Sequence, residues 1–364
     1  MSKDPLVDLV FSLFKPRYIG TGVDPNDLDL LVETIDDWGQ WCDEWSKLGK
    51  RHEDLADEAL RQGRLVSAGE AYLRAAICYH SGKHLYGADP ARYDVAHASM
   101  LRCYLAGAPY FSYPAEHVQI PFRGKSIAGY IRLPRGVKRP PVAVILPGLD
   151  AAKEELHAWS EAFLDRGMAT LTLDGPGQGE TAYQLPVTAD WGAVLGAVID
   201  FLEARSDVDA EQVGVVGQSL GALYAPLAAA GEPRLKACVA NCGPYDWGRV
   251  LPLLPQVSQE LFRIRAYAAD TAEAQKLANT MSLEGLAEKI KCPLLVVFGA
   301  GDRLVPPSEG ERLASEASGP SKLVVYEEGN HVCFNISYKF RPLTADWSAE
   351  ILSGDAARIE RAMA

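Results

Sequence analysis

Six short apolar runs, separated by stretches of helical pattern, set the strongest limit on the fold of this chain. The runs are nearly continuous in Val, Leu and Ile, which is typical of strands buried on both faces. Strands that alternate with helices along a chain form a parallel sheet with helices on both faces. The predicted strands lie in the segments PVAVILPG, MATLTLDG, VGVVG, ACVANCG, PLLVVFGAGD and KLVVYEEG.

A β-hairpin precedes the first of these runs. The segment HVQIPFRGKSIAGYIRLPRG alternates apolar and polar residues around Arg123-Gly124-Lys125, which is the pattern of two strands joined by a tight turn. Between about Tyr245 and Lys291 the sequence has a helical pattern and no strand run. We therefore expect a helical insertion over about residues 245–291, after the sixth strand of the sheet.

The first part of the chain, residues 1–113, has a helical pattern and predicts an all-helical N-terminal domain, with residues 114–364 forming the α/β domain. In LDLLVETIDDWGQWCDEWSKLG, Trp38, Trp41 and Trp45 stand at i, i+3 and i+7, which places them on one face of a helix. Such a stripe packs into a core more often than it lines a pocket for an aromatic ligand.

The composition excludes several classes of partner. The net charge is −12 and there is no block of Lys and Arg, so nucleic acid is not an expected partner. The seven cysteines are scattered without a CxxC pair, and His80 and His84 lack an evident third ligand, so no metal site is expected. The apolar run at the N-terminus is too short for a signal peptide or a membrane span. A cytoplasmic protein that acts on a small molecule, without a membrane partner, is the expectation.

A single serine stands between two glycines where the strand run VGVVG gives way to an alanine-rich helical stretch. In parallel sheets, ligands bind beyond the carboxyl ends of the strands. The pattern Gly217-x-Ser219-x-Gly221 between a strand and a helix is typical of a nucleophile elbow. Such a turn pushes the serine oxygen clear of the sheet, and the glycines avoid a clash where strand meets helix. Ser219 is therefore the candidate nucleophile.

A candidate base and a candidate orienting acid follow Ser219, each after a later strand. A serine hydroxyl needs a base that takes its proton, and the base needs a partner that orients it. Asp302 follows the strand in PLLVVFGAGD and His331 follows KLVVYEEG, so the three residues occur in the order Ser, Asp, His. The expected donors to a developing oxyanion are the backbone amide of Leu220, at the start of the next helix, and that of Leu149, after PVAVILPG.

The glycine-rich segment GPGQGE, after the strand in MATLTLDG, raises the alternative of a phosphate-binding loop. The dinucleotide motif needs glycine at its sixth position, where this chain has Glu180, and the Gly-Lys-Ser/Thr sequence of a P-loop is absent. A nucleotide site is therefore not expected. Asp174 and Glu180 flank this turn, and we expect both to be structural.

Five motifs together, GLDAAKEE, DRGMATLTLDGPGQGET, GQSLGALYA, GAGDRLVPP and GNHVCFN, resemble a family of α/β-hydrolases. This family includes 2,6-dihydroxypseudooxynicotine hydrolase, the fermentation-respiration switch protein and fungal polyketide-shortening hydrolases of pigment synthesis. The resemblance implies an α/β-hydrolase fold with a mostly parallel eight-stranded sheet, an N-terminal helical domain that covers the active site, no cofactor and often a homodimer. It also implies Ser219, Asp302 and His331 as the catalytic triad.

Acidic residues near the expected site are further candidates. Lys153, Glu154 and Glu155 match the family's KEE sequence after the oxyanion loop, where acids are also explained by the positive end of a helix dipole. We consider Glu154, Glu155 and Asp246 as candidates for residues that hold the reacting groups in position without contacting the substrate.

The sequence leaves three functions open. The first is hydrolysis of an ester-type acyl bond in a small to medium substrate, with aromatic compounds among the candidates. The second is hydrolysis of a carbon–carbon bond in an activated ketone of the 1,3-diketone or acyl-phenol type. The third is a non-catalytic binding or regulatory role, for which loss of a triad residue would be the usual sign, and none is lost.

One departure from the family bears on the second function. The resemblance implies that the nicotine-degrading carbon–carbon hydrolase has an extra glutamate after the tryptophan of the loop that follows strand six. The matching stretch here is Trp247-Gly248-Arg249-Val250, without an acid. The nearest acids are Asp246 and Glu260, either of which would have to substitute for it.

Overall fold

The computed structural model describes residues 4–87 and 89–364. The described chain divides into two compact units, of which the first ends at Glu116 and the second begins at His117. The division into domains of residues 1–113 and 114–364 stays a prediction.

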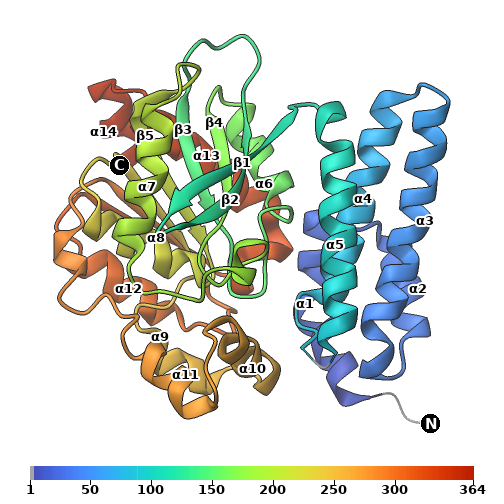
Figure 1. The fold of residues 1–364 in the computed structure, drawn as a ribbon. Helices are drawn as coiled ribbons and strands as arrows, with labels where there is room; N and C mark the ends of the chain where they lie inside the picture. The colour runs from blue at the N-terminus through green and yellow to red at the C-terminus, as the bar shows by residue number, and fades with distance from the viewer. Residues whose placement is uncertain (1–3, 88) are drawn as a thin grey trace. The chain divides into compact units, whose positions relative to one another are not determined.

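An eight-stranded sheet forms the centre of the second unit, with the strand order β1-β2-β4-β3-β5-β6-β7-β8 (Figure 1). β2 runs antiparallel to β4, and the neighbouring pairs from β4 to β8 are parallel. The predicted hairpin is present, and its turn residues Arg123 and Gly124 both have positive φ. The strands are β1 (Ala115–Phe122), β2 (Lys125–Arg132), β3 (Pro141–Leu146), β4 (Ala169–Asp174), β5 (Asp209–Gln218), β6 (Ala237–Asn241), β7 (Leu294–Gly299) and β8 (Ser321–Tyr326).

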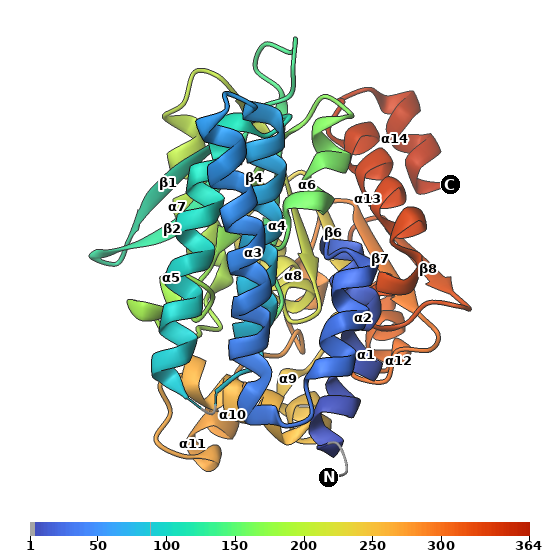
Figure 2. The ribbon, with the colours of Figure 1, turned by 90° about the vertical axis from the view of Figure 1, so that its right-hand side faces the viewer.

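Two pairs of helices pack on this sheet, which explains why β4, β6 and β7 are buried along their whole length. α7 (Trp191–Glu203) and α8 (Gly221–Gly231) meet through the stacked rings of Trp191 and Tyr224, whose centroids are 4.1 Å apart. α6 (His157–Leu164) and α13 (Ser337–Ile351) lie side by side (Figures 1 and 2), and Trp159 Nε1 donates to Thr344 Oγ1 at 3.0 Å. The predicted α/β-hydrolase fold is confirmed. The remaining helices outside the insertion are η3 (Thr181–Tyr183), α12 (Pro307–Glu316), η6 (His331–Ile336) and α14 (Ala356–Met363).

The segment between β6 and β7 is helical, as the sequence predicts. Its two ends are joined by backbone hydrogen bonds, from Trp247 N to Met281 O at 2.9 Å and from Leu283 N to Tyr245 O at 3.0 Å. These bonds bring residues 281–283 back beside the start of the segment. The segment contains α9 (Trp247–Val250), η4 (Leu251–Leu253), α10 (Gln256–Arg265), α11 (Thr271–Ala278) and η5 (Ala287–Lys289).

The described part of the first unit is helical, drawn in blue to teal in Figure 1. The longest helices, α3 and α4, are joined by a short turn at Gly63, where φ is +71°. The helices are α1 (Pro5–Thr21), α2 (Pro25–Thr34), η1 (Trp38–Gln40), α3 (Trp41–Arg61), α4 (Leu65–Lys83), α5 (Pro90–Gly107) and η2 (Ala108–Tyr110).

The prediction of one helix face for three tryptophans is wrong for Trp38. Asp37 and Gln40 form a capping box around a short 3-10 turn that holds Trp38, and the α-helix begins only at Trp41. The Asp37 side chain accepts a local backbone N–H and so competes with continuation of a helix. Trp41 and Trp45 are fully buried, which agrees with a packing role for these two.

Candidate active site

Ser219 lies at the junction of β5 and α8, in a backbone conformation that is rare for a residue with a side chain. Its φ is +53°, and its amide donates to the carbonyl oxygen of Asn241 at 2.9 Å. Strained backbone of this kind is common at functional sites, and it persists only where the surrounding structure holds it in place. The two glycines of the motif explain how the turn closes: a Cβ on Gly217 would lie 1.9 Å from Gly221 O, and one on Gly221 would lie 2.5 Å from Leu146 O. A larger residue at either position would force the strand and the helix apart.

The structure brings the three predicted triad residues together. Ser219 Oγ lies 2.9 Å from His331 Nε2, and His331 Nδ1 lies 2.7 Å from Asp302 Oδ2. With its ring proton on Nδ1, His331 donates to the carboxylate and accepts the serine hydroxyl at Nε2. The Asp302 side chain is fully buried, and its other oxygen accepts the amides of Leu304 at 2.8 Å and Val305 at 3.0 Å.

Asn241, at the end of β6, ties the serine turn to the histidine loop. Its carbonyl accepts the Ser219 amide, and its side-chain Nδ2 donates to Val332 O at 3.2 Å. Val332 has a φ of +61°, so the turn after His331 is itself held in an uncommon conformation. Asn241 was not among the residues expected at the site. Its position at the end of a strand beside β5 was the signal that could have found it.

The two predicted oxyanion donors flank Ser219. Leu220 is the residue before α8, and Leu149 follows Gly148, on which a Cβ would lie 3.4 Å from Ser219 Oγ. Within the described chain, the amides of Leu149 and Leu220 donate to no other protein group. Neither amide is therefore committed to a hydrogen bond within the described chain.

Lys153 and Glu154 form a buried ionic cluster with acids from the β4 loop. Lys153 Nζ lies 2.9 Å from Glu154 Oε1, 2.9 Å from Asp174 Oδ2 and 3.0 Å from Glu180 Oε2. The Tyr130 hydroxyl donates to Glu154 Oε1 at 3.0 Å. Asp174 and Glu180 were expected to have a structural role at the turn, and in this cluster they also pair with the buried Lys153 ammonium.

The charges of this cluster shift the pKa values of its members. Burial alone would lower the pKa of the Lys153 ammonium, but Asp174, Glu154 and Glu180 together raise it above its ordinary value. Burial would raise the pKa of Glu180, but hydrogen bonds from His117 and Lys153 lower it to about 2. Lys153 and Glu180 are therefore charged at neutral pH.

The other two acids considered from the sequence have partners of their own. Asp246 caps α9 by accepting Arg249 N at 3.1 Å, and it also accepts the hydroxyl of Ser282 at 3.3 Å. Glu155 is buried in the neighbourhood of Arg341, whose pKa is lowered to about 10 by burial while the charge of Glu155 acts in the opposite direction.

The described residues offer no metal site beside the serine. Among residues 4–87 and 89–364, no group of three His, Cys, Asp or Glu side chains could hold a metal ion, and the seven cysteines are free thiols. His84 is buried, with its Nδ1 2.9 Å from Ser81 O. None of the helices in this part of the chain is both long and apolar enough to cross a membrane.

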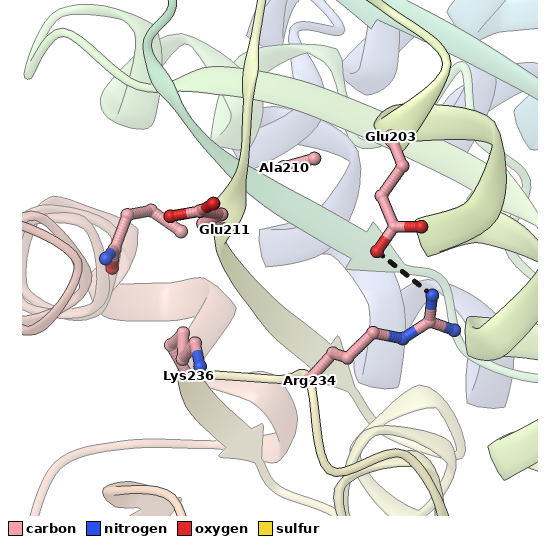
Figure 3. A pocket seen from close by; sticks show the side chains of 6 residues that line it. Glu203, Ala210, Glu211, Arg234 and Lys236 are labelled. Carbon is pink, nitrogen blue, oxygen red and sulfur yellow. Dashed lines mark hydrogen bonds and ion pairs between the residues drawn. The ribbon is translucent and has the colours of Figure 1, made fainter.

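A shallow hollow on the second unit lies at the opposite end of β5 from Ser219 (Figure 3). Arg234 in this hollow already pairs with Glu203, Asp200 and Glu232, so its charge is balanced within the protein. The hollow therefore has the properties of an ordinary surface groove. It is lined by Glu203, Ala210, Glu211, Gln212, Arg234 and Lys236.

Comparison with known proteins identifies the family. Residues 25–328 match the family described as Esterase FrsA-like, which is most of the chain. The chain belongs to the FrsA-like esterase family. It is therefore a hydrolase of the α/β type, and the family resemblance inferred from the sequence motifs is confirmed.

Individual members of the family are similar over different lengths. The chain is 32% identical over 317 residues to 2,6-dihydropseudooxynicotine hydrolase from Paenarthrobacter nicotinovorans, which covers 86% of this chain and 84% of the relative. It is 36% identical over 228 residues to the hydrolyase poxO from Penicillium oxalicum, of which it spans about half, 54%. The crystal structure of the 2,6-dihydroxy-pseudo-oxynicotine hydrolase matches with a TM-score of 0.85 at 30% identity, over 93% of this chain and 95% of that one.

Proposed function

We propose that the protein is a serine-dependent hydrolase that cleaves an ester-type acyl bond in a small to medium substrate. The observation that carries the proposal is the continuous hydrogen-bond chain from Ser219 Oγ through His331 to the buried carboxylate of Asp302. A hydroxyl, an imidazole and a carboxylate in this order are the groups that nucleophilic acyl transfer requires.

The reaction follows from the geometry of these three groups. His331 Nε2 takes the proton of Ser219 as Oγ attacks the acyl carbon, and a tetrahedral intermediate forms. His331 then gives that proton to the leaving oxygen, and the acyl group remains on Ser219. A water molecule, deprotonated by the same imidazole, releases the carboxylic acid and restores the serine. Asp302 keeps the ring proton on Nδ1 and stabilises the imidazolium in both steps.

The oxyanion of the intermediate would be bound by the amides of Leu220 and Leu149. Both amides lie beside Ser219 and donate to no other group in the described chain, which supports this role. A backbone donor that is held in place before the reaction stabilises developing charge without reorganisation.

Hydrolysis of a carbon–carbon bond is the second candidate, favoured by the overall similarity to the 2,6-dihydropseudooxynicotine hydrolase. Against it stands Val250, a buried apolar residue in the loop where the resemblance implies a glutamate. Asp246 is engaged in capping α9, and Glu260 pairs with Arg263 at 2.7 Å. Because both substitute acids are already bound to other groups, we favour ester cleavage.

Labelling with a fluorescent fluorophosphonate tests the nucleophile. We expect the wild-type protein and the control Ser308→Ala, which alters an exposed serine of α12, to be labelled equally. We expect Ser219→Ala to be unlabelled and to lose turnover of p-nitrophenyl esters. Near wild-type turnover in Ser219→Ala, or labelling of another residue, would contradict the proposal. Protein that is folded but never labelled would instead support the binding or regulatory role.

A substrate panel separates the two hydrolytic reactions. We expect turnover of p-nitrophenyl esters, with aromatic acyl groups included among them. Turnover of only 1,3-diketones and acyl-phenols would favour the carbon–carbon reaction. The family resemblance also leads us to propose a homodimer, which light scattering on the eluting protein would test. We further propose a cytoplasmic location, which localisation of a tagged chain would test.

A further inference from the structure

The loop that follows β3 accepts two hydrogen bonds from one side chain, that of Gln178 in the loop that follows β4. Gln178 Nε2 donates to Pro147 O at 2.6 Å and to Gly148 O at 2.9 Å. The Oε1 atom of the same side chain accepts the amide of Gly175 at 3.1 Å. Gln178 is almost completely buried, so these three bonds are made away from water.

The hydrogen-bond partners define the orientation of this amide. Of the two polar groups in the glutamine amide, only the NH₂ group has two N–H donors for two carbonyl oxygens. Only the amide oxygen can accept a backbone N–H. With the group reversed, an oxygen would face two carbonyls at less than 3 Å. Nε2 therefore faces the Pro147 and Gly148 carbonyls.

The two hydrogen bonds from Gln178 also set the direction of the neighbouring N–H groups. The described chain contains no cis peptide bond, and in a planar trans peptide the N–H points opposite to the C=O. With the Pro147 and Gly148 carbonyls held toward Gln178, the amides of Gly148 and Leu149 point away from it. The Cα of Gly148 packs against Ser219, because a Cβ there would lie 3.1 Å from Ser219 Cβ.

We propose that Gln178 is a positioning residue of the oxyanion hole, which aims the Leu149 amide at the oxygen of a substrate bound to Ser219. This inference rests on the proposed function, because it assigns Gln178 a role in the same reaction. The residue does not contact the reacting atoms, and it acts through the Gly148–Leu149 peptide.

The loop that follows β4 is bonded to the loop that follows β3 at a second place, through Asp174. Asp174 Oδ1 accepts the Lys153 amide at 2.8 Å, and Asp174 Oδ2 accepts the Glu180 amide at 2.9 Å. Gly179 makes this possible, since a Cβ there would lie 2.0 Å from the Asp174 carboxylate. Gln178 and Asp174 thus hold the β3 loop near both of its ends, at Gly148 and at Lys153. The glycine-rich segment that resembled a phosphate loop in the sequence serves here to bind a neighbouring loop.

Two variants of Gln178 and one control test the role. Gln178→Glu keeps the shape but replaces the donors with carboxylate oxygens that repel both carbonyls. Gln178→Met fills a similar volume without donors and without a charge, which keeps the test available if the first variant does not fold. Gln184→Glu makes the same change at an exposed glutamine of the same segment and serves as the control.

The readout is the rate constant for labelling by a fluorescent ethyl fluorophosphonate, measured as a function of pH. Its transition state places a phosphoryl oxygen in the oxyanion hole, so no natural substrate is needed. Loss of one oxyanion donor lowers rates by roughly 100- to 1,000-fold, and we expect misdirection of one donor to lower the plateau rate by about 10- to 100-fold. In Gln178→Met, which adds no charge, the pH of half-maximal labelling should stay that of the wild type, because the Ser219–His331–Asp302 chain is untouched.

The outcomes distinguish this inference from the proposed function. A lowered plateau in both Gln178 variants, with an unchanged midpoint in Gln178→Met and with Gln184→Glu equal to wild type, supports the positioning role. Folded Gln178 variants that are labelled at the wild-type rate overturn it while the serine hydrolase stands. A shifted midpoint in Gln178→Met also overturns it, because the triad itself would then be disturbed. Wild-type protein that is not labelled at Ser219 overturns both.

Discussion

Replacing Lys153 with methionine tests whether the buried ionic cluster holds the α/β unit together. The Lys153 side chain is fully buried, and its ammonium group lies within 3.0 Å of carboxylate oxygens from Glu154, Asp174 and Glu180. Methionine has a similar length, so Lys153→Met removes the charge with little change in packing. Three acids are then left in the interior without their shared cation.

The expected loss follows from these distances. Two unit charges 2.9 Å apart attract by about 6 kcal/mol at an effective dielectric of about 20. Burial of the charges offsets much of this gross attraction, and removal of one partner of a buried ion pair costs about 3–5 kcal/mol in practice. We expect Lys153→Met to lower the stability at pH 7 by this amount. The loss should shrink at pH 5.5, because carboxylates without their cation take up protons more readily than those of the wild type.

Hydrogen exchange followed by mass spectrometry measures this loss locally. The opening free energy of the β4 amides, after correction for the intrinsic exchange rate at each pH, is compared between wild type, Lys153→Met and the exposed control Lys138→Met. The double variant Lys153→Met/Asp174→Asn should recover part of the stability, since one unpaired acid is removed. A loss below about 1 kcal/mol at pH 7, or an equal loss at both pH values, would refute the reasoning.

Two further predictions concern the triad and a buried histidine. Asp302→Asn should lower kcat for p-nitrophenyl esters by roughly 10,000-fold with little change in KM, because an asparagine can hold His331 in the wrong tautomer; a loss below tenfold would argue against the orienting role. Burial and then the charge of Arg132 lower the pKa of His157 to about 4. Since the unfolded chain takes up this proton near pH 6.5 and the folded chain does not, stability should fall by about 1.4 kcal/mol per pH unit from pH 6.5 to pH 4. Urea unfolding at several pH values should show a shallower fall in His157→Gln, and an identical slope in both proteins would contradict the assignment.

The strands, and the meeting of Ser219 with His331 and Asp302, could be predicted because their signals are local or lie at strand ends. Continuous apolar runs marked the buried strands, and the glycines around Ser219 marked a strand-to-helix turn. Asp302 and His331 were recognised because the carboxyl ends of parallel strands meet at one edge of a sheet. The helix expected through Trp38 was wrong, because the capping bonds of Asp37 and Gln40 interrupt it in a way that apolar periodicity does not register.

The supporting contacts were outside the reach of such patterns. Gln178 was read only as part of a glycine-rich segment, and Asn241 only as part of a strand run. Their roles depend on which strands are neighbours: β3 lies between β4 and β5, and β6 lies beside β5. That order brings Gln178 to the Gly148 carbonyl and brings Asn241 to both Ser219 and Val332.

The sequence by itself determined the class of fold, the serine turn and the meeting of Asp302 and His331 with Ser219 at one edge of the sheet, since each follows from the period of apolar residues or from position at a strand end. Only the tertiary structure decided how Lys153 is neutralised and that Asp246 caps a helix. It also decided that Gln178 hydrogen-bonds to the loop that contains Leu149. These are pairings between side chains and loops far apart in the chain. They depend on strand order and on distances of about 3 Å, which a sequence pattern does not encode.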